Sequence, residues 1–131
     1  GYTGALISKM VGARTPVYSL EILPEIAEQA LRNHVAGHYN VRVLCRDGWA
    51  GHPEKAPFDR ILVWAAVPTT IVLGNLKGQL AVGGIMIAPV QETHGHQRLA
   101  HIRRDGPGPE DFATNYLREP VNFVPLVDSL D

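Results

Sequence analysis

The stretch Val17-Tyr18-Ser19-Leu20-Glu21-Ile22, with the residues that follow it, decides the fold. Its β-branched and aromatic residues predict a strand. Pro24 suits the first turn of a helix, where its missing N–H costs nothing, and Gly37 suits the end of that helix. A second strand is predicted over residues 41–46. The buried face of the intervening helix is predicted from its apolar residues, which are Ile26, Ala27, Ala30, Leu31 and Val35.

The same alternation extends to both sides of this stretch. Apolar residues at 6, 7, 10 and 11 predict a helix that ends at Gly12. On the other side, we expect a strand covered on both faces over 60–66, a weaker helix over 69–80 and a strand over 85–90. After residue 90 the pattern changes to strand–loop–strand, with strands predicted over 97–103 and 121–127. The predicted fold class is α/β, with a doubly wound, mostly parallel sheet and antiparallel C-terminal strands.

Length and composition restrict the possible functions. The 131 residues predict a single domain, and a hydrophobic content of 45% excludes a wholly disordered chain. The formal charge of −1 and the lack of a basic stripe argue against a nucleic-acid partner. The single cysteine, Cys45, excludes an internal disulfide framework. No apolar run approaches the ~18–20 residues that span a bilayer, so we expect a cytoplasmic protein without a membrane partner.

Acidic residues fall at the ends of two predicted strands, and ligands of open parallel sheets bind beyond such ends. Glu21 lies 20 residues after Gly1, close to the spacing at which a carboxylate accepts hydrogen bonds from both hydroxyls of a ribose. It could equally be an acid that stabilises the start of the helix near Pro24. Asp47-Gly48 could accept a hydrogen bond from an adenine amine, or it could be a plain turn.

Other reactive side chains have weaker interpretations. His94 and His96, with His101 nearby, could bind a metal, but histidines on polar loops are usually solvated, and we predict no metal site. His34 and His38 have the i, i+4 spacing of metal ligands, yet Gly37 lies between them and ends the helix. Cys45 is expected to be a small buried side chain and not a nucleophile. Trp49 could cover an adenine or a peptide, or it could pack under its loop.

Five blocks, taken in order, resemble the protein-L-isoaspartate O-methyltransferase family. They are Tyr18-Ser19-Leu20-Glu21-Ile22, Arg46-Asp47-Gly48, Ala56-Pro57-Phe58-Asp59-Arg60-Ile61-Leu62-Val63, Ala65-Ala66-Val67-Pro68 and Phe123-Val124-Pro125-Leu126. The resemblance runs from residue 1 to about residue 128. Gly1-Tyr2 would be the end of the family's Gly-x-Gly-Ser-Gly-Tyr loop.

The resemblance implies a class I methyltransferase that moves a methyl group from S-adenosylmethionine to the α-carboxylate of L-isoaspartyl residues, which begins protein repair. No catalytic side chain is expected, because an ionised carboxylate attacks the methyl group without a base and catalysis is mainly positioning. The partners would be isoaspartyl peptides or proteins, bound by a monomer. The implied cofactor residues are Gly1 at the methionine part, Glu21 at the ribose, Ile22 (or Leu20) flanking the adenine, Asp47 and Gly48 at the adenine edge, and Ala65; the implied substrate residues are Ala66, Pro68, Gln97 and Val124.

Departures from the family pattern leave two alternatives open. Trp64 replaces a small residue or threonine, and Val67 replaces a common alanine. The protein could therefore act on another peptide carboxylate, or it could be a non-catalytic adaptor that keeps the fold. In the family, a first strand, the glycine loop and a substrate loop precede Gly1. We therefore expect residues 1–131 to be an N-terminally truncated, partial methyltransferase domain that is inactive alone. Strands 17–22 and 60–66 would then leave a slot for the missing strand or pair directly.

Overall fold

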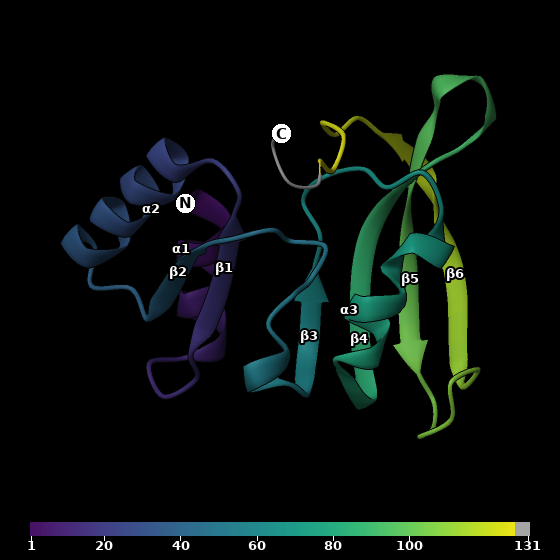
Figure 1. Ribbon diagram of the computed structural model, residues 1–131, viewed down its shortest axis with the longest axis horizontal. Helices are drawn as coiled ribbons and strands as arrows, with labels where there is room; N and C mark the ends of the chain where they lie inside the picture. The colour runs from purple at the N-terminus through teal and green to yellow at the C-terminus, as the bar shows by residue number, and fades with distance from the viewer. Residues whose placement is uncertain (128–131) are drawn as a thin grey trace. The chain divides into compact units, whose positions relative to one another are not determined.

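The computed structural model describes residues 1–127, and their contacts divide them into two compact units (Figure 1). The N-terminal unit comprises residues 1–48, and the C-terminal unit comprises residues 49–127. Each unit has its own sheet, with two strands in the first and four in the second. Both parallel and antiparallel strand pairs are present, in the order that the sequence predicts. The predicted α/β class is confirmed.

The N-terminal unit follows the predicted alternation of helices and strands. Its elements are α1 (Tyr2–Val11), β1 (Val17–Glu21), α2 (Pro24–Ala36) and β2 (Val41–Cys45). The two strands pair in parallel, from Val17 opposite Val41 to Glu21 opposite Cys45. Pro24 occupies the first turn of α2, and the backbone N–H of Gly37 closes the helix by donating to the Asn33 carbonyl oxygen over 3.0 Å. Local sequence signals therefore specify every element of this unit.

The buried face of α2 differs from the predicted one. Ala27 and Ala30 are buried as expected, but Ile26, Leu31 and Val35 are exposed, and His34 is buried in their place. The reason is the close approach of α1, where a Cβ atom at Gly4 would lie 3.3 Å from the imidazole of His34. Such an approach favours the face of α2 that carries alanines, so the stripe at positions 27, 30 and 34 faces inward.

The buried imidazole of His34 predicts a pH-dependent stability. Only 2% of this residue is exposed, and neither ring nitrogen has a hydrogen-bond partner among the described residues. Burial lowers the pKa of His34 below its usual 6.5, because it penalises the charged form of the imidazole. Between the lowered pKa and 6.5 the unfolded chain binds the proton and the folded chain does not, so this stability contribution is lost as the pH falls below about 6.5.

We therefore expect the free energy of unfolding to fall between pH 7.5 and pH 5.5, and the His34→Leu variant to lose part of that dependence. Urea unfolding at both pH values measures the effect. The control is His38→Asn, because His38 is exposed and its positive φ of 52° suits asparagine. A His34→Leu variant with the pH dependence of the unchanged chain would contradict this explanation.

The C-terminal unit contains a four-stranded sheet in the order β3-β4-β5-β6 (Figure 1). β3 (Phe58–Leu62) pairs in parallel with β4 (Leu80–Gln91), which pairs antiparallel with β5 (Gln97–Arg104), which pairs antiparallel with β6 (Phe112–Val121). The shorter elements are the 3₁₀ turns Pro53–Lys55, Thr70–Leu73 and Thr93–Gly95 and the helix α3 (Gly74–Gly78).

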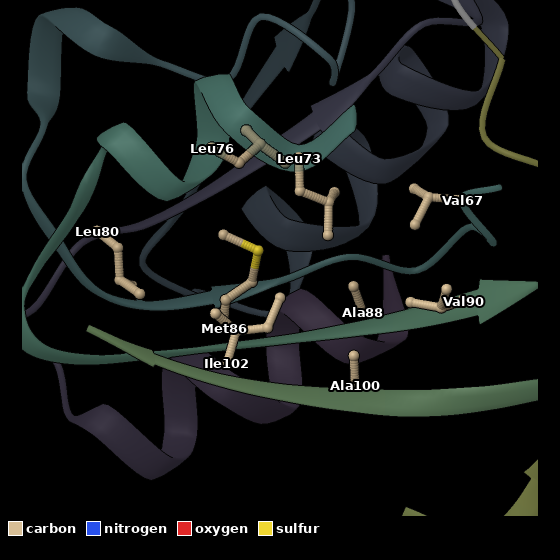
Figure 2. Close-up of a cluster of buried hydrophobic side chains, with 9 residues drawn as sticks. All are labelled: Val67, Leu73, Leu76, Leu80, Met86, Ala88, Val90, Ala100 and Ile102. Atoms are coloured by element: carbon tan, nitrogen blue, oxygen red, sulfur yellow. The ribbon is translucent and has the colours of Figure 1, made fainter. Parts of the chain in front are cut away.

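The core of this unit lies between α3 and one face of the sheet. Figure 2 shows Leu73 and Leu76, from the turn and the helix after residue 69, directed towards side chains of β4 and β5. The buried cluster consists of Val67, Leu73, Leu76, Leu80, Met86, Ala88, Val90, Ala100 and Ile102. Burial of this continuous apolar set is the main source of stability for the unit.

Three predictions for this unit are wrong in detail. The strand expected over 60–66 ends at Leu62, the helix expected over 69–80 is a 3₁₀ turn followed by a five-residue helix, and the last strand covers 112–121 where 121–127 was expected. Gly74 and Gly78 explain the weak helix, because glycine costs about 1 kcal/mol there. β6 was missed because an edge strand bonds on one side only and tolerates polar residues such as Asn115, Arg118 and Glu119.

For strands 17–22 and 60–66 the sequence left two alternatives, a slot for a missing strand or direct pairing. β1 pairs with β2 and β3 pairs with β4, so among the described residues the direct pairing of β1 with β3 is not formed. None of the helices within residues 1–127 is long and apolar enough to cross a membrane.

Candidate functional site

Glu21 lies at the carboxyl end of β1, where its half-buried side chain serves the start of α2. Its Oε1 atom accepts a hydrogen bond from the backbone N–H of Leu23 over 3.0 Å. This contact just before Pro24 is compatible with the alternative interpretation of Glu21 as an acid at the start of the helix. The second oxygen, Oε2, makes no hydrogen bond within residues 1–127. Since a carboxylate has two acceptor oxygens, the helix contact and a ligand contact are compatible.

Asp47 follows the neighbouring strand at the same edge of this two-stranded sheet. Glu21 pairs with Cys45, and the backbone N–H of Arg46 donates to the Glu21 carbonyl oxygen over 3.1 Å. Asp47 comes next and is half-buried, as is Gly48 after it. The parallel register thus brings Ile22 and the Asp47-Gly48 pair to the edge that carries Glu21. Carboxylates at this edge fit the hydroxyl and amine protons of an adenosine, because both groups are donors that need anionic or carbonyl acceptors.

Gly1 has a structural role in addition to the one that was predicted. It is the N-cap residue of α1, and its carbonyl oxygen accepts the N–H of Ala5 over 3.2 Å. A Cβ atom at Gly1 would lie 3.2 Å from Nε2 of His34. Gly1 and Gly4 therefore allow α1 and α2 to approach, whatever ligand contact Gly1 makes.

In the C-terminal unit, the chain after β3 meets the segment 122–127. The backbone N–H of Ala66 donates to the Val124 carbonyl oxygen over 2.7 Å, and the N–H of Leu126 donates to the Ala66 carbonyl oxygen over 2.9 Å. The next residue, Val67, bonds in the same way with Pro89 and Gln91 of β4. Pro68 follows and is exposed. Two predicted substrate residues, Ala66 and Val124, are thus directly bonded.

Gln97 also belongs to this group, but through its side-chain amide. Its Oε1 atom accepts the backbone N–H of Phe123 over 2.7 Å, and its Nε2 donates to the Phe123 carbonyl oxygen over 3.0 Å. The structure therefore places Gln97 against Phe123, the residue before Val124, with both amide atoms bonded to the chain itself.

Comparison with known proteins gives a match over the whole chain. The family model for protein-L-isoaspartate(D-aspartate) O-methyltransferase matches residues 1–131. The chain belongs to this family.

Individual protein-L-isoaspartate O-methyltransferases support the assignment. The enzyme of Ignicoccus hospitalis is 43% identical over 129 residues, which are 98% of this chain and 58% of that protein. The enzyme of Methanococcoides burtonii is 37% identical, over 97% of this chain and 60% of that protein. The chain thus spans less than two thirds of the length of these curated relatives.

Two solved structures have the same fold. A protein-L-isoaspartate O-methyltransferase superposes with a TM-score of 0.83 at 31% identity, over 95% of this chain and 38% of that one. A putative protein-L-isoaspartate O-methyltransferase from Plasmodium falciparum, in complex with S-adenosyl-L-homocysteine, has a TM-score of 0.67 over 86% of this chain and 52% of that one. At 23% identity the second likeness shows the fold alone.

Trp64 is one of the two departures from the pattern of the protein-L-isoaspartate O-methyltransferase family that the sequence analysis identified. It lies where the chain leaves β3, and 53% of it is exposed. Its ring centroid is 6.0 Å from that of Phe123, with the planes tilted by 37°. Ala65, beside it, is half-buried. The indole therefore packs against the Phe123 ring and keeps half of its surface free for contact.

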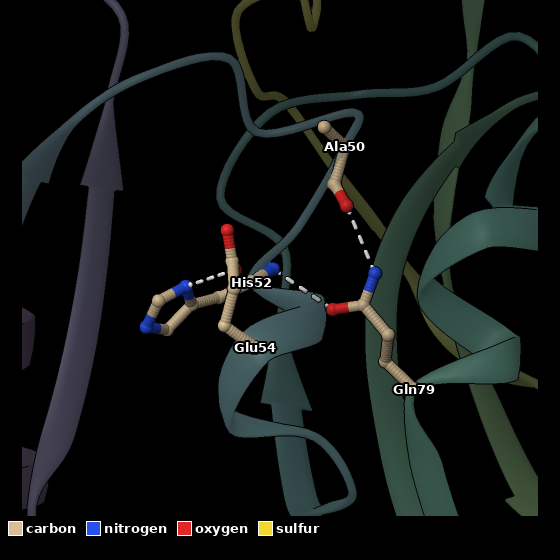
Figure 3. A network of polar contacts seen from close by, with 4 residues as sticks. All are labelled: Ala50, His52, Glu54 and Gln79. Atoms are coloured by element: carbon tan, nitrogen blue, oxygen red, sulfur yellow. Dashed lines mark hydrogen bonds and ion pairs between the residues drawn. The ribbon is translucent and has the colours of Figure 1, made fainter.

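A buried glutamine that the sequence analysis missed holds the loop after Asp47-Gly48. Figure 3 shows Gln79 accepting the His52 N–H at Oε1 and donating from Nε2 to the Ala50 carbonyl oxygen, each over 2.8 Å. Gly51 lies between these residues with φ of +66°, and a Cβ atom there would lie 2.5 Å from Oε1 of Gln79. The sequence offers one signal for this residue. Gln79 follows Leu73 and Leu76 at a spacing of three residues, so it is a polar residue at a position where the pattern predicts a buried apolar one.

Cys45 contradicts its prediction, because its side chain is exposed where a buried one was expected. β2 is an edge strand of its two-stranded sheet, so its side chains have fewer covering neighbours than those of a central strand. Cys45 lines a shallow apolar groove of about 210 Å³ with Pro24, Ala27, Glu28, Leu31 and Val43.

The histidines considered as metal ligands do not gather into a site. His94 and His96 are exposed on the turn before β5, and His34 is buried while His38 is exposed. Among residues 1–127, no three histidine, cysteine, aspartate or glutamate side chains lie together in a metal-binding arrangement.

Proposed function

We propose that the protein transfers a methyl group from S-adenosylmethionine to the α-carboxylate of L-isoaspartyl residues in damaged proteins. The observation that carries this proposal is the family match over all 131 residues, with relatives of 43% and 37% identity that bear this activity in their names. The relative from Plasmodium falciparum, which was solved with S-adenosyl-L-homocysteine, supports the choice of cofactor.

The proposed cofactor residues accept hydrogen bonds from the adenosine or lie against it. Glu21 accepts the two ribose hydroxyls, for which Oε2 is open and Oε1 can share its Leu23 contact. Asp47 accepts the adenine amine, Gly48 allows the backbone to approach the ring, and Ile22 covers one ring face. Gly1 borders the methionine part and Ala65 lies near the methyl group. When bound, S-adenosylmethionine supplies a sulfonium methyl group, to which a substrate carboxylate oxygen bonds while the carbon–sulfur bond breaks and leaves its electron pair on sulfur.

The proposed substrate residues lie in the C-terminal unit. Ala66, Pro68 and Val124 form the surface against which the isoaspartyl residue is placed, with Gln97 supporting it. No side chain needs to remove a proton, because the substrate carboxylate is ionised near pH 7. The chain therefore contributes by positioning, and a well-oriented pair of reactants gains several orders of magnitude in rate without acid–base groups.

A methyl-transfer assay of the whole protein tests the proposal. Two peptides of the same sequence are compared, one with L-isoaspartate and one with L-aspartate at a single position. We expect methyl ester on the isoaspartyl peptide and at least about 100-fold less on the aspartyl peptide, since mispositioning of a carboxylate by about 1 Å costs that much. Equal methylation of both peptides would overturn the specificity, and methylation of neither would overturn the activity.

One observation favours a second candidate function. Trp64 offers a large exposed indole where the resemblance implies a small residue or threonine, and this bulk favours another peptide carboxylate as substrate. The Trp64→Thr variant in the same assay separates the two functions. If the original residue selects a different substrate, this change raises activity on the isoaspartyl peptide and lowers it on the other.

We further propose that the protein acts as a cytoplasmic monomer on peptides, not on nucleic acid, consistent with its charge of −1.

A further inference from the structure

The segment from Asn122 to Val127, which we call the Phe123 segment, belongs to no regular strand. It begins where β6 ends at Val121, and within it only Pro125 forms an isolated bridge, to Ala66. Leu126 packs against the core, whereas Val124 is 72% exposed. A segment of this kind needs side-chain contacts to fix its backbone, because no continuous ladder does so.

Gln97 provides such a contact through its side-chain amide. It is the first residue of β5, and only 7% of it is exposed. Its amide forms a reciprocal pair with Phe123, accepting the N–H over 2.7 Å and donating to the carbonyl oxygen over 3.0 Å. The second amide proton points to Oε1 of Gln91, 3.4 Å from Nε2. One residue of β5 thus replaces the ladder partner that Phe123 lacks.

The position of Phe123 determines what lies on either side of it. The next residue, Val124, accepts the N–H of Ala66, and the Phe123 ring contacts the ring of Trp64. A rotation of the Phe123 backbone would therefore move the surface formed by Trp64, Ala66 and Val124. Gln97 is buried, so it fixes the position of this surface through Phe123 without being part of it.

We propose that Gln97 is a positioning residue. It holds the Phe123 segment against residues 64–66, which follow β3, and it does not touch the substrate. The effect on catalysis rests on the function proposed above, whereas the effect on Phe123 does not. This role replaces the expectation that Gln97 binds the substrate directly.

Substitution of Gln97 has a distinctive consequence. A Gln97→Glu carboxylate accepts from the Phe123 N–H but cannot donate to the Phe123 carbonyl oxygen, whereas its protonated form does both. Amide hydrogen exchange of the Phe123 N–H reads this out without any assay of activity. Because the carboxylate repels the Phe123 carbonyl oxygen, we expect Gln97→Glu to lower the protection factor of the Phe123 N–H about tenfold or more at pH 8, and to regain it when the pH is low enough to protonate the carboxylate, measured relative to the Gln91 N–H. Gln97→Met should lose protection at both pH values.

Controls and contradictory outcomes follow from the same contacts. Gln91→Met removes only the weak partner and should leave the Phe123 protection unchanged. The paired contact of the Gln97 amide with Phe123 is called the clamp here. Should Phe123 be as protected in Gln97→Met as in the unchanged protein, the clamp is refuted. In the whole protein, we expect Gln97→Met to lower kcat/KM for the isoaspartyl peptide about tenfold, with the Kd for S-adenosylhomocysteine changed less than twofold. Loss of Phe123 protection with unchanged kcat/KM would overturn the effect of Gln97 on catalysis, while its contact with Phe123 would stand. If the unchanged whole protein shows no methyl transfer, the proposed function fails, and the exchange data still decide the clamp.

Discussion

Replacing Glu21 with alanine in the whole protein is expected to weaken binding of S-adenosylhomocysteine by about 30-fold or more. The carboxylate lies at the end of β1 with Oε2 unbonded within the described residues, and we expect it to accept both ribose hydroxyls. Hydrogen bonds to charged groups contribute about 1.5–3 kcal/mol each, and loss of about 2 kcal/mol corresponds to a factor of about 30. Isothermal titration calorimetry measures the affinity directly.

Two variants control for indirect effects. Glu25→Ala removes an exposed acid from the first turn of α2 and should bind as the unchanged protein does. Glu21→Gln keeps an acceptor for the Leu23 N–H but loses the charge, so it separates the ligand contact from the start of the helix. A Glu21→Ala affinity within about threefold of the original would show that Glu21 serves the helix alone.

The largest expected effect on stability comes from Leu73, which is fully buried between α3 and the sheet (Figure 2). We expect Leu73→Ala to lower the free energy of unfolding by about 2–5 kcal/mol, because the substitution removes buried methyl groups and leaves a cavity that the surroundings fill only partly. Urea unfolding of the chain measures the change.

Ile71 offers a matched control in the same 3₁₀ turn, because 83% of it is exposed. Ile71→Ala should change the free energy of unfolding by less than about 0.5 kcal/mol. Equal effects of the two substitutions would mean that the Leu73 cluster is not the core of the C-terminal unit.

Local signals in the sequence predicted the elements whose stability is local. Pro24 and Gly37 bound α2 within one residue, and the β-branched runs at 17–22 and 41–46 gave β1 and β2. The two acids at one sheet edge were found for the same reason, since strand ends follow from the elements and parallel strands end together.

Features that depend on distant partners were not predictable in this way. β6 carries several polar residues because its exposed edge requires no apolar alternation, and the buried face of α2 depends on Gly1 and Gly4. The amides of Gln79 and Gln97 reach residues 27 and 26 positions away in the chain, a distance at which spacing carries no signal. The polar contacts made by these two glutamines were therefore visible only in the structure.

A crystal structure of the whole protein with S-adenosylhomocysteine tests the central claim most directly. The claim is that the acids at the ends of the paired strands β1 and β2 hold one adenosine. We predict the Glu21 carboxylate within about 3.2 Å of the ribose hydroxyl oxygens and an Asp47 carboxylate oxygen at the same distance from the adenine amine. An adenosine bound with both carboxylates out of hydrogen-bonding reach would contradict it.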